Sequence, residues 1–146
     1  MNIDLIIKRL RLAITTFHGI VCHTNGAWGS NWKGEGMNAL YAYFAYGSNL
    51  MPDRLLQRCP TAVPYAPAIL PNYRLTERLY ADVDFTPRAK VHGFVYLLRA
   101  QDVARLDRYE GYPRIYCRYT VDVILDDGTE LPALIYEMTP KTKEIR

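Results

Sequence analysis

The sequence predicts an α+β domain built on a mostly antiparallel, curled sheet, and three observations support this prediction. Aromatic, β-branched or alternating apolar runs, which are typical of strands, recur between residues 41 and 138, whereas few stretches have helical spacing. The segment Asp126-Asp127-Gly128-Thr129 has the composition of a hairpin turn between two such runs. A chain of 146 residues with 49% apolar side chains can bury a single core.

The expected elements begin with a strand over 41–45, where aromatic residues dominate, and a helix over about 52–58. An extended stretch punctuated by prolines follows, at Pro60, Pro64, Pro67 and Pro71. We then expect strands over 73–77 and 92–98, separated by a loop around 84–88. Strands over 116–125 and 131–138 flank the predicted hairpin turn and complete the sheet.

A short helix is predicted over 101–109, because Val103, Leu106 and Tyr109 recur at a spacing of three. Gly111 stands where a C-terminal glycine is expected, and Pro113 prevents the helix from continuing. Glu110 therefore falls at the helix end, where the helix dipole disfavours a carboxylate. Taken alone, Glu110 is more typical of a solvated surface residue than of a catalytic one.

The segment Tyr46-Gly47-Ser48-Asn49-Leu50 joins the first predicted strand to the helix that follows it. A Gly-Ser-Asn turn at such a junction exposes several backbone N–H groups in a small space, and such a concavity binds an anion. The same tripeptide is also ordinary turn chemistry, because glycine takes positive φ and Ser and Asn bond to nearby backbone.

Three segments in this order resemble the γ-glutamylcyclotransferase family: YGSN at 46–49, VHGFVYLL at 91–98 and LDRYEG at 106–111. The resemblance runs from about Tyr43 to Met138. It implies a small, closed β-barrel flanked by a few helices. It also implies an enzyme that releases 5-oxoproline from a γ-glutamyl amide, when the substrate's own α-amine attacks its γ-carbonyl group.

The resemblance assigns the candidate site residues as well. Glu110 matches the glutamate that handles the proton of the attacking amine. The loop of Tyr46, Gly47, Ser48, Asn49, Leu50 and Met51 matches the segment that holds the γ-glutamyl group, and Tyr136 matches a tyrosine that hydrogen-bonds in the pocket. A buried carboxylate suits this chemistry, because burial raises its pKa toward that of an α-amine, which is about 8. No metal ion or organic cofactor is expected, since the cyclisation requires none.

The charges do not indicate a nucleic-acid partner, and the resemblance implies a small-molecule γ-glutamyl substrate. The formal net charge is only +3, and the basic residues form no cluster interleaved with aromatic ones. His18, His23 and His92 have no metal-ligand pattern. The odd number of widely spaced cysteines, Cys22, Cys59 and Cys117, indicates a reducing compartment, so we expect a cytoplasmic protein that does not associate with membranes.

We expect residues 37–146 to form the catalytic domain and residues 1–36 to be an N-terminal extension outside it. Beyond the last strand, the family usually continues with a further helical segment. The sequence from Thr139 to Arg146 predicts no such helix, so the domain is expected to be truncated there, with one pocket wall open.

Two other functions remain open at this point. One is a non-catalytic module that binds a small molecule on the same fold. The other is a maturation enzyme or acyltransferase that removes a γ-glutamyl protecting group and differs only in the leaving amine. The sequence does not choose among glutathione, γ-glutamyl dipeptides, γ-glutamylamines and larger metabolites, and it leaves the oligomeric state undetermined.

Overall fold

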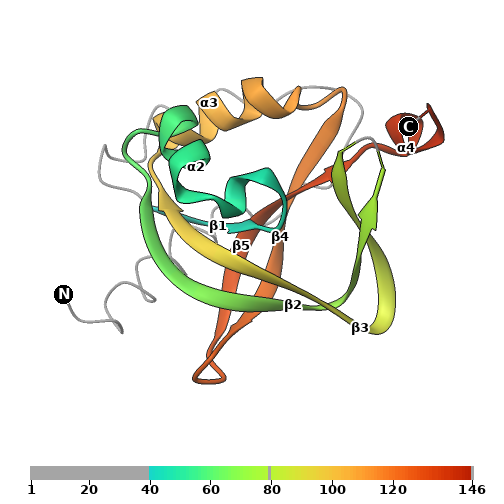
Figure 1. Cartoon of the computed structure of the whole chain (residues 1–146), viewed down its shortest axis with the longest axis horizontal. Coiled ribbons are helices and arrows are strands. Elements are labelled where there is room, and N and C mark those ends of the chain that lie inside the picture. Colours follow the sequence, from blue (N-terminus) through green and yellow to red (C-terminus); the bar gives the residue numbers. More distant parts are fainter. Residues whose placement is uncertain (1–39, 79, 146) are drawn as a thin grey trace.

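A closed barrel of five strands forms the body of the protein in the computed structural model, which describes residues 40–78 and 80–145 (Figure 1). Its strands lie in the order β1-β3-β2-β4-β5, and all neighbours are antiparallel except β1 and β5, which are parallel. The bounds are β1 Tyr41–Ala45, β2 Val63–Glu77, β3 Ala81–Leu98, β4 Tyr116–Leu125 and β5 Glu130–Met138. The predicted α+β fold with a small, mostly antiparallel barrel is therefore confirmed.

Strand β1 is buried on both faces and separates two cores. Successive side chains of a strand point to opposite faces, so Ala42 and Phe44 pack in one apolar cluster while Tyr41, Tyr43 and Ala45 pack in the other. The first cluster takes side chains from all five strands of the barrel. The second joins β1, β3, β4 and β5 to α2 and α3, and this is the side on which the candidate site forms.

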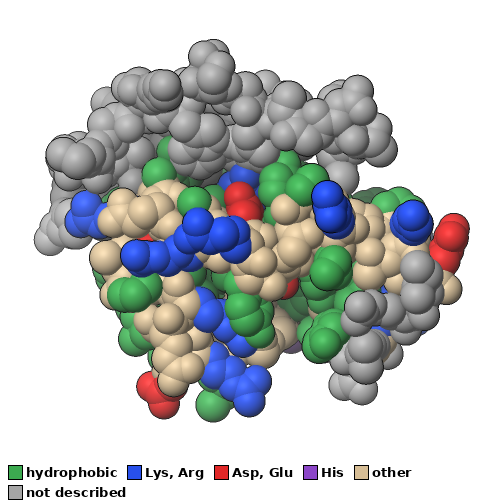
Figure 2. All heavy atoms as spheres, turned by 90° about the horizontal axis from the view of Figure 1, so that it is seen from above, with side chains coloured by type: hydrophobic (Ala, Val, Ile, Leu, Met, Phe, Trp, Pro, Cys, Tyr) green, Lys and Arg blue, Asp and Glu red, His purple; other side chains and the backbone are tan. Residues whose placement is uncertain are grey.

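Helices α2 (Pro52–Arg58) and α3 (Ala100–Glu110) lie together over one end of the barrel (Figure 1). A 3-10 turn, η2 (Ser48–Leu50), precedes α2. Seen from this side, the described surface carries Lys and Arg side chains spread among apolar ones (Figure 2). Gly111 ends α3 with φ of 68°, a left-handed conformation that glycine adopts without steric cost, as its position in the sequence predicts.

The prediction of a loop around residues 84–88 is wrong, because β3 continues through these residues to Leu98. The pair β2 and β3 bends at an irregularity there instead of separating. The register shifts between Pro71 and Tyr73, both Asn72 and Arg88 have positive φ, and the Arg88 N–H donates to Asn72 Oδ1 at 3.2 Å. A bulge of this kind uses turn-like residues within a strand, which explains the incorrect prediction. The prolines of β2 lie in the same strand, and a second register shift follows Pro64.

A short helix, α4 (Pro140–Ile145), follows the last strand, where the sequence analysis predicted none. Thr139 precedes Pro140, which suits the first helical position because its nitrogen needs no partner there. The Thr142 N–H contacts Thr139 Oγ1 at 3.4 Å, and the two threonine hydroxyls lie 2.8 Å apart. This Thr-Pro start was the signal that the sequence analysis did not use.

The predicted N-terminal extension, residues 1–36, lies outside the described residues, as do Cys22, His18 and His23. Cys59 and Cys117 are both buried. Among residues 40–78 and 80–145, no helix has the length and apolar character needed to cross a lipid bilayer.

Candidate active site

A cavity of about 340 Å³ opens between the loop after β1, the end of α3 and the barrel wall. Four of the six predicted loop residues line it, together with the predicted Glu110 and Tyr136. The full lining comprises Tyr43, Tyr46, Gly47, Ser48, Asn49, Tyr80, Ala81, Tyr109, Glu110, Ile115, Tyr116 and Tyr136. Leu50 and Met51 do not line it, and Met51 is 59% exposed.

The loop after β1 uses part of its backbone hydrogen-bonding capacity internally. The Leu50 N–H donates to the Gly47 carbonyl at 3.0 Å, and the Met51 N–H donates to the Ser48 carbonyl at 3.3 Å. The first N–H groups of a helical turn have no acceptor within that turn. Of the predicted anion-binding donors, the N–H groups of Ser48 and Asn49 therefore remain, and both residues line the cavity.

Asn49 connects this loop to Glu110. Its Nδ2 lies 3.4 Å from Glu110 Oε1 and 3.0 Å from the hydroxyl of Tyr43. Its Oδ1 accepts a hydrogen bond from Arg58 at the end of α2, so the orientation of the amide is set by its neighbours. The loop and the carboxyl group, 61 positions apart in the sequence, thus face each other across one cavity.

Burial raises the pKa of Glu110 from an ordinary value of 4.5 to about 7. The positive charge of Arg58 and the hydrogen bond from Asn49 oppose this rise without cancelling it. A carboxyl group with a pKa near 7 changes protonation at neutral pH, so it can both accept and return a proton.

Arg58 ties α2, the loop and α3 together. Besides Asn49, it donates to the Ser48 hydroxyl at 3.2 Å and to the hydroxyl of Tyr109, the residue before Glu110. Its guanidinium carbon also lies 3.5 Å from the centre of the Tyr109 ring, within the range of a cation–π contact. These contacts fix the end of α3, and with it the backbone that carries Glu110.

The hydroxyl group of Tyr136 on β5 is held in place by the charged pair of Asp107 and Arg118. Its hydroxyl donates to Asp107 Oδ1 at 2.6 Å, while Arg118, 1% exposed, lies 3.2 Å from Asp107 Oδ2. Burial raises the pKa of Asp107, and the charge of Arg118 opposes that rise. The hydroxyl of Tyr46 donates to the Tyr136 carbonyl oxygen at 2.5 Å, which links the loop after β1 to β5.

The tip of the β2–β3 hairpin forms the opposite wall, because Tyr80 and Ala81 line the cavity. The Tyr116 hydroxyl donates to the Ala81 carbonyl at 3.0 Å, and a side chain at Gly47 would meet the Ala81 methyl group at 3.0 Å. Gly47 therefore allows the hairpin tip to approach the loop closely.

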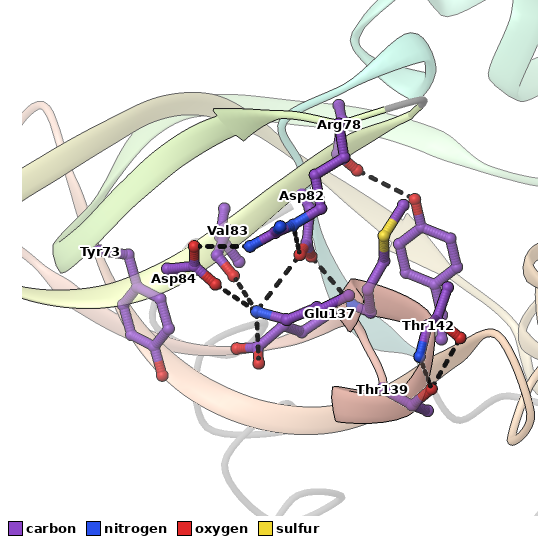
Figure 3. A network of polar contacts seen from close by, with 12 residues as sticks. Tyr73, Arg78, Asp82, Val83, Asp84, Glu137, Thr139 and Thr142 are labelled. Atoms are coloured by element: carbon purple, nitrogen blue, oxygen red, sulfur yellow. Dashed lines mark hydrogen bonds and ion pairs between the residues drawn. The ribbon is translucent and has the colours of Figure 1, made fainter. Parts of the chain in front are cut away.

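A network of ion pairs anchors this hairpin to the C-terminal helix (Figure 3). Lys143 of α4 contacts Asp82 at 3.2 Å, Glu137 at 3.2 Å and Asp84, and Arg78 pairs with both aspartates. Asp82 is fully buried, and its other oxygen accepts the Met138 N–H at 2.9 Å. Lys143 thus holds the hairpin whose tip forms one wall of the cavity.

Several residues of the site were not predicted from the sequence, including Tyr43, Arg58, Tyr109 and Tyr116. Strand alternation could have found Tyr43, which shares a face with the apolar residues under the helices. Arg58 lies in the last turn of its helix, where a basic residue is favoured by the dipole alone, so its position carried no functional signal. Among the described residues, no group of three or more His, Cys, Asp or Glu side chains is arranged to hold a metal ion.

Comparison with known proteins agrees with this geometry. Residues 43–146 match the family model described as gamma-glutamyl cyclotransferase, AIG2-like. Gamma-glutamylcyclotransferases of Bos taurus and Homo sapiens are 31% and 30% identical over 112 residues, which cover 68% of this chain. The chain therefore belongs to the AIG2-like γ-glutamylcyclotransferase family. It spans 60% of the length of each of these two relatives.

Solved structures agree on the fold. A structure described as a gamma-glutamyl cyclotransferase has a TM-score of 0.64 at 28% identity, covering 73% of this chain and 75% of that one. An AIG2-like protein from Mus musculus has a TM-score of 0.56 at 18% identity, covering 71% of this chain and 82% of that one, and is similar in fold alone.

Proposed function

We propose that this protein is an enzyme that releases 5-oxoproline from a γ-glutamyl amide, with Glu110 as its general acid–base group. The observation that carries the proposal is a partly buried carboxyl group with a pKa of about 7 that faces, across one cavity, the loop with the N–H groups of Ser48 and Asn49. Membership of the family supports the same reaction. The cavity of about 340 Å³ falls at the small end of the ligand-pocket range, about 300–1,000 Å³.

The first step is proton removal from the substrate's α-ammonium group, whose pKa is about 8. With a pKa of about 7, Glu110 is ionised in a large part of the enzyme at neutral pH and lies only about one unit below the ammonium group. An unperturbed glutamate would be a much weaker base. Burial of Glu110 therefore supplies a base matched to its task.

The free amine then attacks the γ-carbonyl carbon, so that a C–N bond closes the five-membered ring and the carbonyl oxygen becomes an oxyanion. Glu110 gives the proton it has taken to the leaving nitrogen and, now ionised, accepts the second proton of the attacking nitrogen. The oxyanion re-forms the carbonyl group as the original amide C–N bond breaks, and the departing amine takes up the proton then held by Glu110, which restores the enzyme. The products are 5-oxoproline and an amine, and no water is consumed. We assign the N–H groups of the loop at Ser48 and Asn49 to the substrate's carboxylate.

Holding the γ-glutamyl chain in a curled conformation is the remaining task. Orientation of this kind contributes about 7–11 kcal/mol in favourable intramolecular reactions. The tyrosine-rich wall and the hairpin tip that Lys143 anchors provide rigid surfaces for it.

The test is to incubate the purified full-length chain with a panel of γ-glutamyl amides and to measure 5-oxoproline. The panel contains glutathione, γ-glutamyl dipeptides and γ-glutamylamines. Glu110→Gln is expected to lower turnover at least about 100-fold, in line with the loss of a general acid–base group, with substrate binding much less affected. Glu130→Gln, which changes an exposed glutamate at the start of β5, is the matched control and should retain full activity.

Two results would contradict the proposal in different ways. Unchanged turnover in the Glu110→Gln protein would remove the role assigned to Glu110. Binding of γ-glutamyl compounds without 5-oxoproline from any of them would favour a non-catalytic binding module on the same fold.

A further inference from the structure

The tyrosines that line the cavity differ in what their hydroxyl groups can still offer a ligand. A phenol has one proton to donate and lone pairs with which to accept. Where the proton is already given to a protein acceptor, only the lone pairs remain. The hydrogen bonds of the cavity therefore indicate which part of a substrate each tyrosine can contact.

Two of these hydroxyl groups already donate their single proton to an acceptor in the protein. Tyr136 donates to Asp107 Oδ1 at 2.6 Å, and Arg118 lies 3.2 Å from the other oxygen of the same carboxyl group. Tyr46 donates to the Tyr136 carbonyl oxygen, which can only accept. Toward the cavity, Tyr136 and Tyr46 can therefore offer only lone pairs, and these suit a cationic N–H donor.

The hydroxyl group of Tyr43 differs from these two, because it can still donate a hydrogen bond to a ligand. Its oxygen accepts from Asn49 Nδ2 at 3.0 Å, an arrangement fixed by the bond from Arg58 to the other end of that amide. In the part of the chain that the structure describes, its proton has no acceptor, although the side chain is only 5% exposed and lines the cavity. Burial, followed by the charge of Glu110, raises the pKa of Tyr43, so the hydroxyl keeps this proton.

We infer that these tyrosines set the orientation of the substrate: Tyr136 and Tyr46 accept hydrogen bonds from its α-ammonium group, and Tyr43 donates to its γ-carbonyl oxygen. This inference rests on the proposed function and adds two subsites to it. The ammonium group then lies on the acceptor side of the cavity with Glu110 as its base. Tyr43 stabilises the oxyanion that forms when the ring closes, because a donor fixed in advance needs no rearrangement at that moment.

The adjacency of the two tyrosines supports this division. The rings of Tyr43 and Tyr136 are in edge contact, with centres 6.0 Å apart. A γ-glutamyl group carries its ammonium nitrogen and γ-carbonyl carbon close together when it curls to cyclise. Neighbouring groups of opposite hydrogen-bonding polarity match that arrangement.

The ammonium subsite is tested by binding to the Glu110→Gln protein, in which turnover is expected to be slow. The probes are γ-glutamyl-alanine and glutaryl-alanine, which lacks only the α-amino group, and binding is measured by calorimetry or by NMR titration. The first probe should bind more tightly. Adding Tyr136→Phe should reduce this preference about tenfold or more, since a hydrogen bond to a charged group is lost, whereas adding Tyr43→Phe should leave it unchanged.

The donor subsite is tested by turnover in the protein that retains Glu110. Tyr43→Phe should lower kcat about 100-fold with little change in KM, as expected for an interaction made only in the transition state. Tyr119→Phe is the control, because it deletes a hydroxyl that hydrogen-bonds Glu137 outside the cavity. It should change neither kcat nor the preference between probes. If Tyr136→Phe does not fold, Tyr46→Phe gives a second test of the acceptor side.

The outcomes separate this inference from the proposed function. If 5-oxoproline is released but Tyr136→Phe keeps the full preference for γ-glutamyl-alanine over glutaryl-alanine, the inference is overturned and the proposed function stands. The same holds if 5-oxoproline is released and Tyr43→Phe leaves kcat unchanged. A Tyr136-dependent preference without 5-oxoproline from any substrate would support the ammonium subsite and remove the enzyme. Equal binding of the two probes to the Glu110→Gln protein would overturn the ammonium subsite, and binding of neither probe would overturn both proposals.

Discussion

Two acidic sites near the β2–β3 hairpin tip differ in how their charges are balanced. In one, Asp82, Asp84 and Glu137 surround Lys143. The hydrogen bond from Lys143 lowers the pKa of Asp84. In the other, Glu110 has a neutral amide as its nearest partner, and burial raises its pKa to about 7.

This difference distinguishes carboxyl groups that stabilise the fold from one that can take part in a reaction. A carboxylate that is paired with a lysine stays ionised and holds elements together, here α4 to the hairpin. A carboxyl group buried without a close cation destabilises the folded protein when it ionises, and this cost makes it able to exchange a proton near neutral pH. We therefore expect Lys143 to matter for stability and Glu110 for turnover.

The largest effect on stability should come from Lys143→Ala. Removing one member of a buried charged network costs about 3–5 kcal/mol, and because Arg78 still pairs with Asp82 and Asp84, we expect a loss of about 2–3 kcal/mol in the free energy of unfolding. Urea denaturation measures it. Lys141→Ala, an exposed lysine of the same helix, should change stability by no more than about 0.5 kcal/mol. Equal effects of the two variants would mean that the network does not anchor the hairpin.

Glu110→Gln should stabilise the protein, in a pH-dependent way. Because the folded pKa is raised, the wild-type protein is free of the cost of a buried charge below pH 4.5 and bears it fully above about pH 7. The stability gained by Glu110→Gln should therefore grow between these values, to about 3 kcal/mol at most. Denaturation of both proteins at a series of pH values measures the difference. A gain that stays constant with pH would contradict the raised pKa.

Arg58→Met should give the smallest of these effects. The charge of Arg58 opposes the raised pKa of Glu110, so its loss should raise that pKa further. The acid limb of the pH profile of kcat/KM, expected near pH 7 in the wild-type protein, should move to higher pH by about half a unit to one unit. Arg54→Met, at an exposed arginine of the same helix, should leave the limb in place. A shift to lower pH in Arg58→Met would show that Arg58 does not act on Glu110 as its position indicates.

The sequence predicted the elements whose signals are local. The limits of β1, α2 and β4 agree with the predicted ranges, and the left-handed Gly111 ends α3 as expected. Two predictions failed because turn-like residues served other purposes. Asn72 and Arg88 bend a continuous strand pair, and Thr139-Pro140 begins a helix.

The candidate site was predictable only in part, for a physical reason. A family motif marks the loop after β1 and Glu110, but the partners of these residues come from elements that pack together only in the folded chain. Arg58 of α2 reaches Asn49 in the loop and Tyr109 on α3, and Tyr136 of β5 reaches Asp107 on α3. Such contacts depend on the packing of elements, which a residue pattern does not encode locally.

Everything proposed for the site depends on Glu110 being a partly buried carboxyl group, with a neutral amide as its partner, that exchanges a proton near neutral pH. NMR observation of its side-chain carboxyl carbon, across pH 3 to 9 and with Glu110→Gln to assign the signal, tests this without any substrate. The carboxyl carbon should titrate near pH 7. A midpoint at the ordinary value of 4.5 or below would contradict it.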